Sequence, residues 1–176
     1  MSGVVVWFTG LPSSGKSTLA QEVQRRLRER GETPCLLDGD VVRRLIAPGL
    51  GYSEEDRRAF YTALGELSAE LARQGLTVLV AATAHQRAYR HHARKLAPHF
   101  IEVWVATPLE ECRSRDSKGL YAAATSRTGM LPGVGTSYEP PAHAEVRASG
   151  GRDEQAVAGV LTLLERVAAG HEPRRP

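Results

Sequence analysis

The segment from Gly10 to Ser17 has the residue types and spacing of a loop that holds phosphate groups. It reads GLPSSGKS and fits the pattern G-x-x-x-x-G-K-[ST]. Glycines let backbone N–H groups point at phosphate oxygens, Lys16 can reach the β- and γ-phosphates, and the Ser17 hydroxyl can join a Mg²⁺ shell. A chance turn is the alternative. We expect a nucleoside triphosphate to be bound through Gly10, Leu11, Pro12, Ser13, Ser14, Gly15, Lys16, Ser17 and Thr18.

Asp38 and Asp40 form a second candidate for chemistry. They follow an apolar segment, Thr33 to Leu37, that is typical of a buried strand. Ligands gather beyond the carboxyl ends of parallel strands, so both carboxylates are expected to face the phosphate loop. Phosphoryl transfer needs charge neutralisation and an acceptor hydroxyl held in line. We predict that Asp40 is the base and that Asp38, with Ser17, lies on the metal side; a turn with Asx hydrogen bonds is the alternative.

Alternating apolar and amphipathic segments predict the elements that position these residues. We expect an α/β fold, a doubly wound parallel sheet with helices on both faces. The expected strands are 4–8, 33–37, 76–82, 100–106 and, at an edge, 144–148. The expected helices are 16–30, 41–47, 53–73 with Ser53 as its cap, 87–96 and 153–169. Thr107, Pro108 and Glu110 predict a capping box for one more helix after the fourth strand.

A single domain, residues 1–170, accounts for this pattern. Between 114 and 145 periodicity fails, while Gly, Pro, Ser and Thr abound. A long segment of this kind inside a compact domain is typical of a lid or a binding loop. Residues 171–176 are expected to form a disordered tail.

The composition limits the class of protein and of partner. With 176 residues, 41% of them hydrophobic and 24% charged, the chain is long enough to bury a core. The net charge of +3 suits anionic small molecules, and we expect neither nucleic acid nor membrane as a partner. A strand begins soon after Met1, which leaves no room for a signal peptide. Cys35 and Cys112 lack metal-ligand spacing, so we expect reduced thiols in a cytoplasmic protein.

Five motifs, in this order, are similar to those of the adenylylsulfate (APS) kinase family. They lie between about Val5 and Pro141 and read WFTGLPSSGKST, LLDGDVVR, GLGYSEEDRR, RDSKGLY and YEPP. The resemblance implies a P-loop kinase-like fold with a lid. It also implies transfer of the γ-phosphate of ATP to the 3′-hydroxyl of APS, giving PAPS and ADP in sulfate assimilation. Mg²⁺ as the cofactor and a homodimer, common in the family, are further implications.

The resemblance assigns roles to residues near the two aspartates. Asp40 matches the family's base. Arg43 and Arg57 match arginines that bind the substrate, where a guanidinium fork suits a sulfate or a phosphate. A solvated helix face is the alternative for each arginine. Tyr52 stands where the family has a Phe that stacks on the substrate adenine.

The resemblance also assigns roles in the lid. Lys118 matches a lysine near the transferred phosphate and the substrate, and Arg115 matches an arginine that lies against the adenine of ATP. Leu131 stands at the aromatic position of the family's Phe-Thr-Gly-Ile-Asp segment. Together with the loop, these matches predict Lys16, Asp40 and Lys118 as the catalytic residues.

The acceptor half departs from the family pattern. Phe60 stands where the family has Asn, and Thr62 and Ala63 stand where it has Arg-Arg. The Ile-Ser-Pro-Tyr loop becomes Thr83 to Gln86, TAHQ in this chain. The loss of a hydrogen-bonding partner can cost about 1–3 kcal/mol of binding. His85 is either a catalytic residue of this loop or, as is commoner for a surface loop, a solvated one.

We interpret the chain as an ATP-dependent kinase of the APS kinase type. One alternative is a related kinase that acts on another nucleotide-like or secondary-metabolite hydroxyl. The other is an ATP-binding regulatory protein without transfer activity. The residues expected to bind the acceptor are Asp38, Arg43, Tyr52, Arg57, Phe60, Thr83, Lys118 and Leu131.

Overall fold

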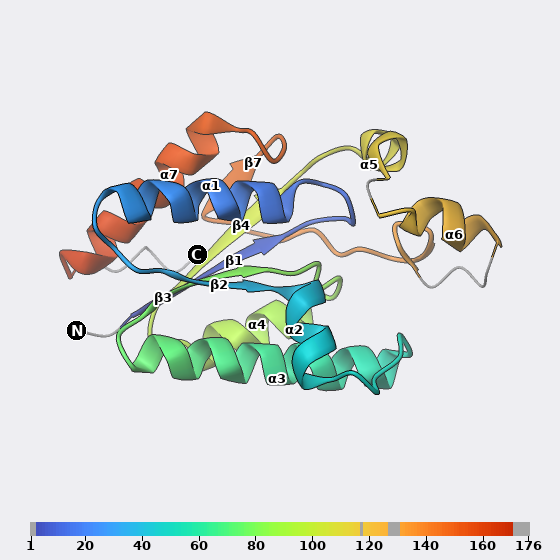
Figure 1. Ribbon diagram of the computed structural model, residues 1–176, viewed down its shortest axis with the longest axis horizontal. Helices are drawn as coiled ribbons and strands as arrows, with labels where there is room; N and C mark the ends of the chain where they lie inside the picture. Colours follow the sequence, from blue (N-terminus) through green and yellow to red (C-terminus); the bar gives the residue numbers. More distant parts are fainter. Residues whose placement is uncertain (1–2, 117, 127–130, 171–176) are drawn as a thin grey trace.

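The computed structural model describes residues 3–116, 118–126 and 131–170, in which helices and strands alternate (Figure 1). The strands are β1 (Val4–Thr9), β2 (Cys35–Asp38), β3 (Thr77–Ala81), β4 (Phe100–Val105), β5 (Leu131–Pro132), β6 (Gly135–Thr136) and β7 (Val146–Ala148). The helices are α1 (Lys16–Glu29), α2 (Gly39–Ile46), α3 (Glu54–Arg73), α4 (Arg87–Leu96), α5 (Leu109–Arg115), α6 (Leu120–Ser126) and α7 (Glu154–Ala168).

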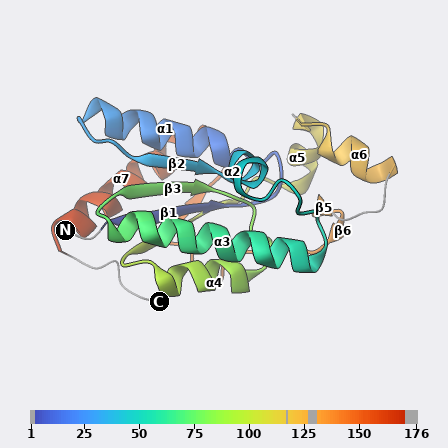
Figure 2. The same cartoon turned by 60° about the horizontal axis from the view of Figure 1, so that its bottom comes forward.

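Five strands form one parallel sheet in the order β2-β3-β1-β4-β7. At its centre, Val6 of β1 lies opposite Leu79 of β3 and Ile101 of β4. Helices α1 and α7 cover one face, and α3 and α4 cover the other (Figures 1 and 2). This arrangement confirms the expected doubly wound α/β sheet, with β7 at the expected edge.

The central strand β1 is buried on both faces along its whole length. Val6 and Phe8 pack against Leu19 of α1 and Val160 of α7, whereas Trp7 packs in the second core cluster, under α3 and α4. The unbroken apolar run therefore reflects two cores rather than one. The phosphate loop therefore begins at the end of a strand whose position is fixed by packing on both faces.

Local caps explain where several helices begin. Ser53 caps α3 as predicted, because its Oγ accepts a hydrogen bond from the backbone N–H of Asp56 at 3.1 Å. Helix α2 begins at Gly39, two residues earlier than expected. The reason is that Asp38 acts as its cap: Oδ1 accepts from the backbone N–H of Asp40 at 3.0 Å.

The capping box predicted for α5 is wrong. Pro108 is the residue before this helix, and no side chain caps it. The Thr107 hydroxyl donates instead to the carbonyl oxygen of Ser14 at 2.7 Å, and Glu110 pairs with Arg113. Thr107 thus joins the segment after β4 to the phosphate loop, a tertiary contact that local sequence does not reveal.

The segment 114–145, expected to lack regular structure, contains the end of α5, the short helix α6 and the paired strands β5 and β6. Figure 1 shows α5 and α6 beyond the carboxyl ends of β1 and β4. The tail 171–176, predicted to be disordered, lies outside the described residues. Among the helices described, none is both long and apolar enough to cross a membrane.

Candidate phosphate-transfer site

The phosphate loop joins β1 to α1 through a turn that requires glycine at two positions. Gly15 has a φ of 102°, and a Cβ on it would lie 2.6 Å from the backbone nitrogen of Gly151. A Cβ on Gly10 would lie 2.6 Å from the carbonyl oxygen of Val105. Both positions therefore exclude larger residues, for reasons of backbone conformation and of contact with neighbouring segments.

Lys16 lies against the backbone of this loop. Its Nζ donates to the carbonyl oxygens of Gly10 at 3.1 Å and of Leu11 at 2.7 Å. Burial lowers the pKa of Lys16 to about 8; the Asp40 carboxylate opposes this effect, and the Lys118 ammonium adds to it. A phosphate at the loop would favour the charged form of Lys16, so anion binding and protonation support each other.

Ser17 and Asp38 bring the loop and the end of β2 into direct contact. The Ser17 Oγ donates to Asp38 Oδ2 at 2.6 Å, while Asp38 Oδ1 accepts from the backbone N–H of Asp40. The structure thus places a hydroxyl and a carboxylate oxygen side by side at the start of α1. Such hard oxygen donors, together with phosphate oxygens and water, fit Mg²⁺.

Asp40 contacts the segment predicted to be a lid rather than the phosphate loop. Its carboxylate forms an ion pair with the Nζ of Lys118, which lies between α5 and α6. Both side chains are exposed, at 65% for Asp40 and 52% for Lys118. The contact spans 78 positions of sequence and places the predicted base beside the predicted lid lysine.

Arg43 lies between two aromatic rings. Its guanidinium carbon is 4.3 Å from the centroid of the Phe60 ring and 4.7 Å from that of Tyr52, and Nη1 donates to the carbonyl oxygen of Gly51 at 2.6 Å. Phe60 is buried, whereas Tyr52 is exposed. Cation–π contacts therefore fix the guanidinium of Arg43 in the absence of any anion.

Arg57 is buried, with 5% of its surface exposed, so it is not part of a solvated helix face. Its Nε donates to the carbonyl oxygen of Tyr52 at 2.9 Å, and its guanidinium carbon lies 5.4 Å from the centroid of the Tyr52 ring. Tyr52 is thus a common neighbour of the two predicted substrate arginines. A buried guanidinium in this position is well suited to hold an anionic group.

The Thr83–Gln86 loop packs inward, and the interpretation of His85 as a solvated residue is wrong. His85 is 1% exposed, and its Nε2 lies 3.5 Å from Glu54 Oε1. In the described part of the chain neither ring nitrogen has a hydrogen-bond partner. Burial, and then the charge of Arg57, lowers the pKa of His85, although Glu54 opposes the shift. Thr83 at the start of the loop accepts a hydrogen bond from Thr9 Oγ1 at 2.6 Å through its carbonyl oxygen.

Sequence periodicity could not show this burial, because the neighbours of His85 come from several elements. The rings of Tyr61 and Tyr89 stand edge-on to it, with centroids 6.4 and 5.6 Å away. The carbonyl oxygen of His85 also accepts a hydrogen bond from the backbone N–H of Glu139. Two distant segments, around Tyr61 and Glu139, and the nearby start of α4 therefore enclose a residue that belongs to a loop in sequence.

The segment 118–136 contacts the phosphate loop on its other side. The Tyr121 hydroxyl of α6 donates to the carbonyl oxygen of Pro12 at 2.9 Å. Gly133, between β5 and β6, lies against the Leu11 side chain, since a Cβ there would be 3.0 Å from Leu11 Cδ2. Leu131 is partly buried in β5. The segment predicted to be a lid therefore contacts the phosphate loop as well as Asp40.

Arg115 belongs to a separate cavity beside the amino end of α1. This cavity has a volume of about 480 Å³ and is lined by Gly15, Thr18, Arg115, Ser149, Gly150, Gly151, Arg152 and Asp153. Arg115 also forms an ion pair with Glu111. Sequence reasoning missed the part from 149 to 153. The Gly-Gly pair that follows the last strand could have suggested it, because ligand sites gather at carboxyl ends of strands.

Tyr138 is a further neighbour that sequence reasoning missed. Its hydroxyl lies 3.0 Å from Thr9 Oγ1, directly before Gly10. The interaction connects the 138–143 segment to the last residue of β1. The YEPP motif contained Tyr138, but the sequence did not indicate which residue it contacts.

The family profile and the curated relatives named below point to one family. Residues 2–149 match the sequence profile of the adenylylsulphate kinase family. An adenylyl-sulfate kinase of Synechococcus sp. is 44% identical over 147 residues, which cover 82% of this chain and 83% of the relative. A Sorangium cellulosum protein named as a probable bifunctional SAT/APS kinase is 39% identical over 99% of this chain, but this chain spans only 30% of its length.

A solved structure gives the same result. An APS kinase of Mycobacterium tuberculosis, in complex with AMPPNP and APS, superposes with a TM-score of 0.85 at 37% sequence identity. The match covers 93% of this chain and 98% of that one. The likeness therefore extends over nearly the whole of both chains.

Proposed function

Because the chain belongs to the adenylylsulfate kinase family, we propose that it transfers the γ-phosphate of ATP to the 3′-hydroxyl of APS, giving PAPS and ADP in sulfate assimilation. The observation that carries this proposal is the junction of two strand ends. Ser17 of the phosphate loop donates to Asp38, and Asp40 lies two residues further on beside Lys118. A phosphate donor and an acceptor hydroxyl can meet at this junction.

The nucleotide end of the site uses the loop and the adjoining cavity. The phosphates of ATP lie on residues 10–18, with the backbone N–H groups and the Lys16 ammonium as donors. The cavity of about 480 Å³ beside Thr18 and Arg115 takes the adenosine. Ser17 and Asp38 hold Mg²⁺, which neutralises charge on the phosphates that the loop orients.

Asp40 and Lys118 act at the transferred group. Asp40 orients the acceptor hydroxyl and accepts its proton. Lys118 pairs with Asp40 without substrates and can turn toward phosphate oxygens when they arrive. The ion pair is exposed on both sides, and such pairs contribute only about 0–1 kcal/mol, so the exchange of partners costs little.

Arg43 and Arg57 bind the anionic end of the acceptor. Tyr52 lies against both guanidinium groups and presents an exposed ring on which an adenine can stack. Phe60 replaces the hydrogen-bonding Asn of the family and supports Arg43 with its ring face instead. A different nucleotide-like or secondary-metabolite hydroxyl is the second candidate acceptor, since Phe60, Thr62, Ala84 and Leu131 change the acceptor half.

The organisation of the protein follows from the same proposal. One domain, residues 1–170, carries the site, and the segment 114–145 acts as a lid that closes over both substrates and excludes water. The substrates are small molecules, and we propose no nucleic acid and no membrane as partners. We also propose that the protein is a homodimer in the cytoplasm. Light scattering after gel filtration measures the number of chains in the assembly.

An acceptor panel tests the function. Purified chain with Mg-ATP is mixed with APS, with adenosine 5′-phosphate or with simple hydroxyl acceptors, and ADP release is followed. We expect release that depends on APS and yields a 3′-phosphorylated product. Turnover of another acceptor without APS turnover would replace the first candidate by the second. Nucleotide binding without turnover of any acceptor would favour a regulatory protein.

A further inference from the structure

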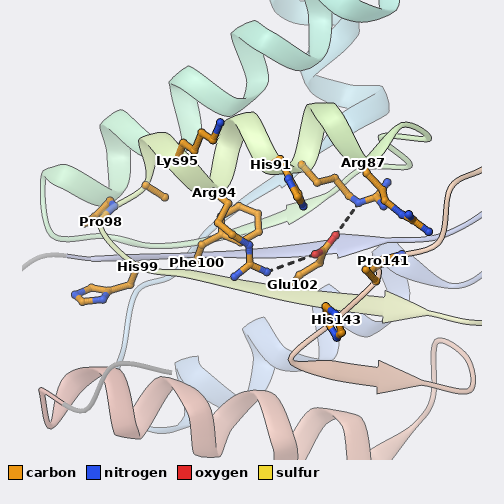
Figure 3. A pocket seen from close by; sticks show the side chains of 13 residues that line it. Arg87, His91, Arg94, Lys95, Pro98, His99, Phe100, Glu102, Pro141 and His143 are labelled. Carbon is orange, nitrogen blue, oxygen red and sulfur yellow. Dashed lines mark hydrogen bonds and ion pairs between the residues drawn. The ribbon is translucent and has the colours of Figure 1, made fainter. Parts of the chain in front are cut away.

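A second cavity lies away from the phosphate loop, between α4 and the segment 141–143, over β4 (Figure 3). Its volume is about 520 Å³, which is the size of a small-molecule site. None of the residues expected to bind ATP or the acceptor lines it. We propose that this groove binds a small polyanion that carries phosphate or sulfate groups.

The groove is strongly basic. Its lining includes four arginine or lysine side chains and three histidines, but only one carboxylate, that of Glu102. The basic residues of α4 recur at helical spacing along one side of the helix: Arg87, Arg90, His91, Arg94 and Lys95. Of these, Arg90 is buried and Arg94 is half-buried, whereas Arg87, His91 and Lys95 are exposed, so the exposed part of the stripe offers positive charge to an anionic ligand.

Two of these arginines form the floor and are already paired. Arg90 is 1% exposed and donates from Nε to Glu102 Oε1 at 2.6 Å. Arg94 donates to both carboxylate oxygens of Glu145, at 2.7 and 2.9 Å, and its guanidinium carbon lies 4.8 Å from the centroid of the Phe100 ring. The carboxylates nearest the groove are thus neutralised, and they offer little repulsion to an incoming anion.

The side chains that remain available to a ligand surround Arg90 and Arg94. The Nε of Arg87 donates to the carbonyl oxygen of Pro140 at 2.6 Å, which orients the guanidinium. Within the described chain, its terminal nitrogens have no acceptor, and the same holds for Lys95 and for the imidazoles of His91 and His143. Figure 3 shows His91 projecting from α4 toward Glu102, with His143 on the opposite wall.

The wall opposite α4 is held firmly in place. The backbone N–H of Arg87 donates to Glu139 Oε2 at 2.7 Å, and Arg90 Nη2 donates to the carbonyl oxygen of Glu139 at 2.6 Å. The backbone N–H of Glu139 in turn donates to the carbonyl oxygen of His85 at 2.8 Å. Hydrogen bonds therefore hold the wall of the groove in place. The side chain of Glu139, the third carboxylate near the groove, already accepts one of them.

The lining favours phosphate or sulfate over other ligands. A guanidinium fork and imidazole N–H groups match the geometry of tetrahedral oxyanions. The Phe100 ring, which could stack on a base, is already covered by Arg94. The large hydrophobic side chains that are exposed in the described chain lie elsewhere, at Val41, Leu45, Ile46, Tyr52 and Leu120. The apolar part of the lining consists of small side chains and the buried Phe100 ring, so it offers little surface to a large apolar partner.

A ¹H–¹⁵N NMR titration with inorganic pyrophosphate tests the proposal, because it separates this groove from the phosphate loop in one experiment. We expect shifts of the backbone N–H signals of residues 87–97, 99, 142 and 143 that follow their own isotherm, besides those of the phosphate loop. The Arg87→Ala/His91→Ala variant should weaken the groove isotherm about tenfold or more and leave the loop isotherm unchanged. Arg28→Ala, which removes an exposed arginine of α1, is the matched control and should keep both.

The same titration is repeated with inorganic sulfate and with a hexaglutamate peptide. Sulfate should shift the same groove signals as pyrophosphate, more weakly because it carries less charge. Pyrophosphate shifts confined to residues 10–18, or groove shifts that survive in Arg87→Ala/His91→Ala, would overturn the proposal. Tighter binding of hexaglutamate than of pyrophosphate would also overturn it and would indicate an acidic protein partner. The test is independent of kinase activity.

Discussion

The guanidinium carbon of Arg43 lies 4.3 Å from the centroid of the buried Phe60 ring. The family resemblance implies an Asn at the position of Phe60, so in the proposed acceptor site a ring face takes the place of a hydrogen-bonding side chain. A ring face cannot bind APS through a hydrogen bond, but it can hold Arg43, which we propose binds the anionic end of the acceptor. We therefore expect an acceptor site that is arranged around Arg43 rather than one that is simply weakened.

Phe60→Leu removes the ring and keeps an apolar side chain. Because a cation–π contact contributes about 0.5–2 kcal/mol, we expect the KM for APS to rise about 2- to 30-fold, with kcat at saturation little changed. Steady-state kinetics at fixed Mg-ATP measures the effect. Phe100→Leu is the control, since it removes another buried ring beneath an arginine, Arg94, away from the site. An unchanged KM in Phe60→Leu would show that the ring does not position Arg43.

Nucleotide affinity should depend on the protonation of Lys16. Burial lowers its pKa to about 8 in the free protein, and a bound phosphate raises it again. The charged form binds the nucleotide, so affinity is highest below pH 8 and falls as the pH rises above it. We expect AMPPNP to bind about tenfold more weakly at pH 9 than at pH 7, measured by calorimetry.

Lys16→Arg provides the control for this prediction. The guanidinium stays charged throughout the range, so any binding that remains should not change with pH. A wild-type affinity that is flat between pH 7 and pH 9 would contradict the lowered pKa of Lys16. An equally steep fall in Lys16→Arg would assign the effect to another group.

His85 should make the protein less stable in mild acid. Burial, followed by Arg57, lowers the pKa of His85, against the opposing charges of Glu54 and Glu139. The folded protein therefore keeps His85 neutral, while the unfolded chain takes up a proton near pH 6.5. The stability that depends on the neutral form is present above that pH and is lost as the pH falls.

Urea unfolding at pH 7 and pH 5 measures this effect. His85→Gln should lose less stability between the two values than the wild type does. His143→Gln, which changes an exposed histidine, should follow the wild type. If His85→Gln shows the full wild-type loss, other groups cause the acid sensitivity and His85 is not held neutral by the fold.

Local sequence was sufficient for most of the fold. The unbroken apolar run of β1 and the Ser53 cap act within a few residues, so both could be predicted. Thr107 shows the limit of this approach. Its position before a proline favours a cap, yet its hydroxyl bonds to Ser14, which lies 93 positions away.

The residues of the candidate site likewise include some that could be predicted from the sequence and some that could not. The phosphate loop and the two aspartates could be located because their spacing is short and their chemistry is narrow. The burial of His85 and the ring beneath Arg43 could not, since both depend on how α3 meets other segments. The basic groove was visible in sequence only as a basic helix, and the facing segment 141–143 turns it into a cavity.

The central claim is that Asp40 receives the proton of the acceptor hydroxyl at the junction of the loop and β2. The most direct measurement is APS-dependent ADP release by Asp40→Asn, beside its AMPPNP affinity and a Glu55→Gln control on the exposed first turn of α3. We expect kcat to fall at least about 100-fold in Asp40→Asn, with AMPPNP affinity within about twofold of the wild type. A kcat within about tenfold of the wild type would contradict the role of Asp40 as the base.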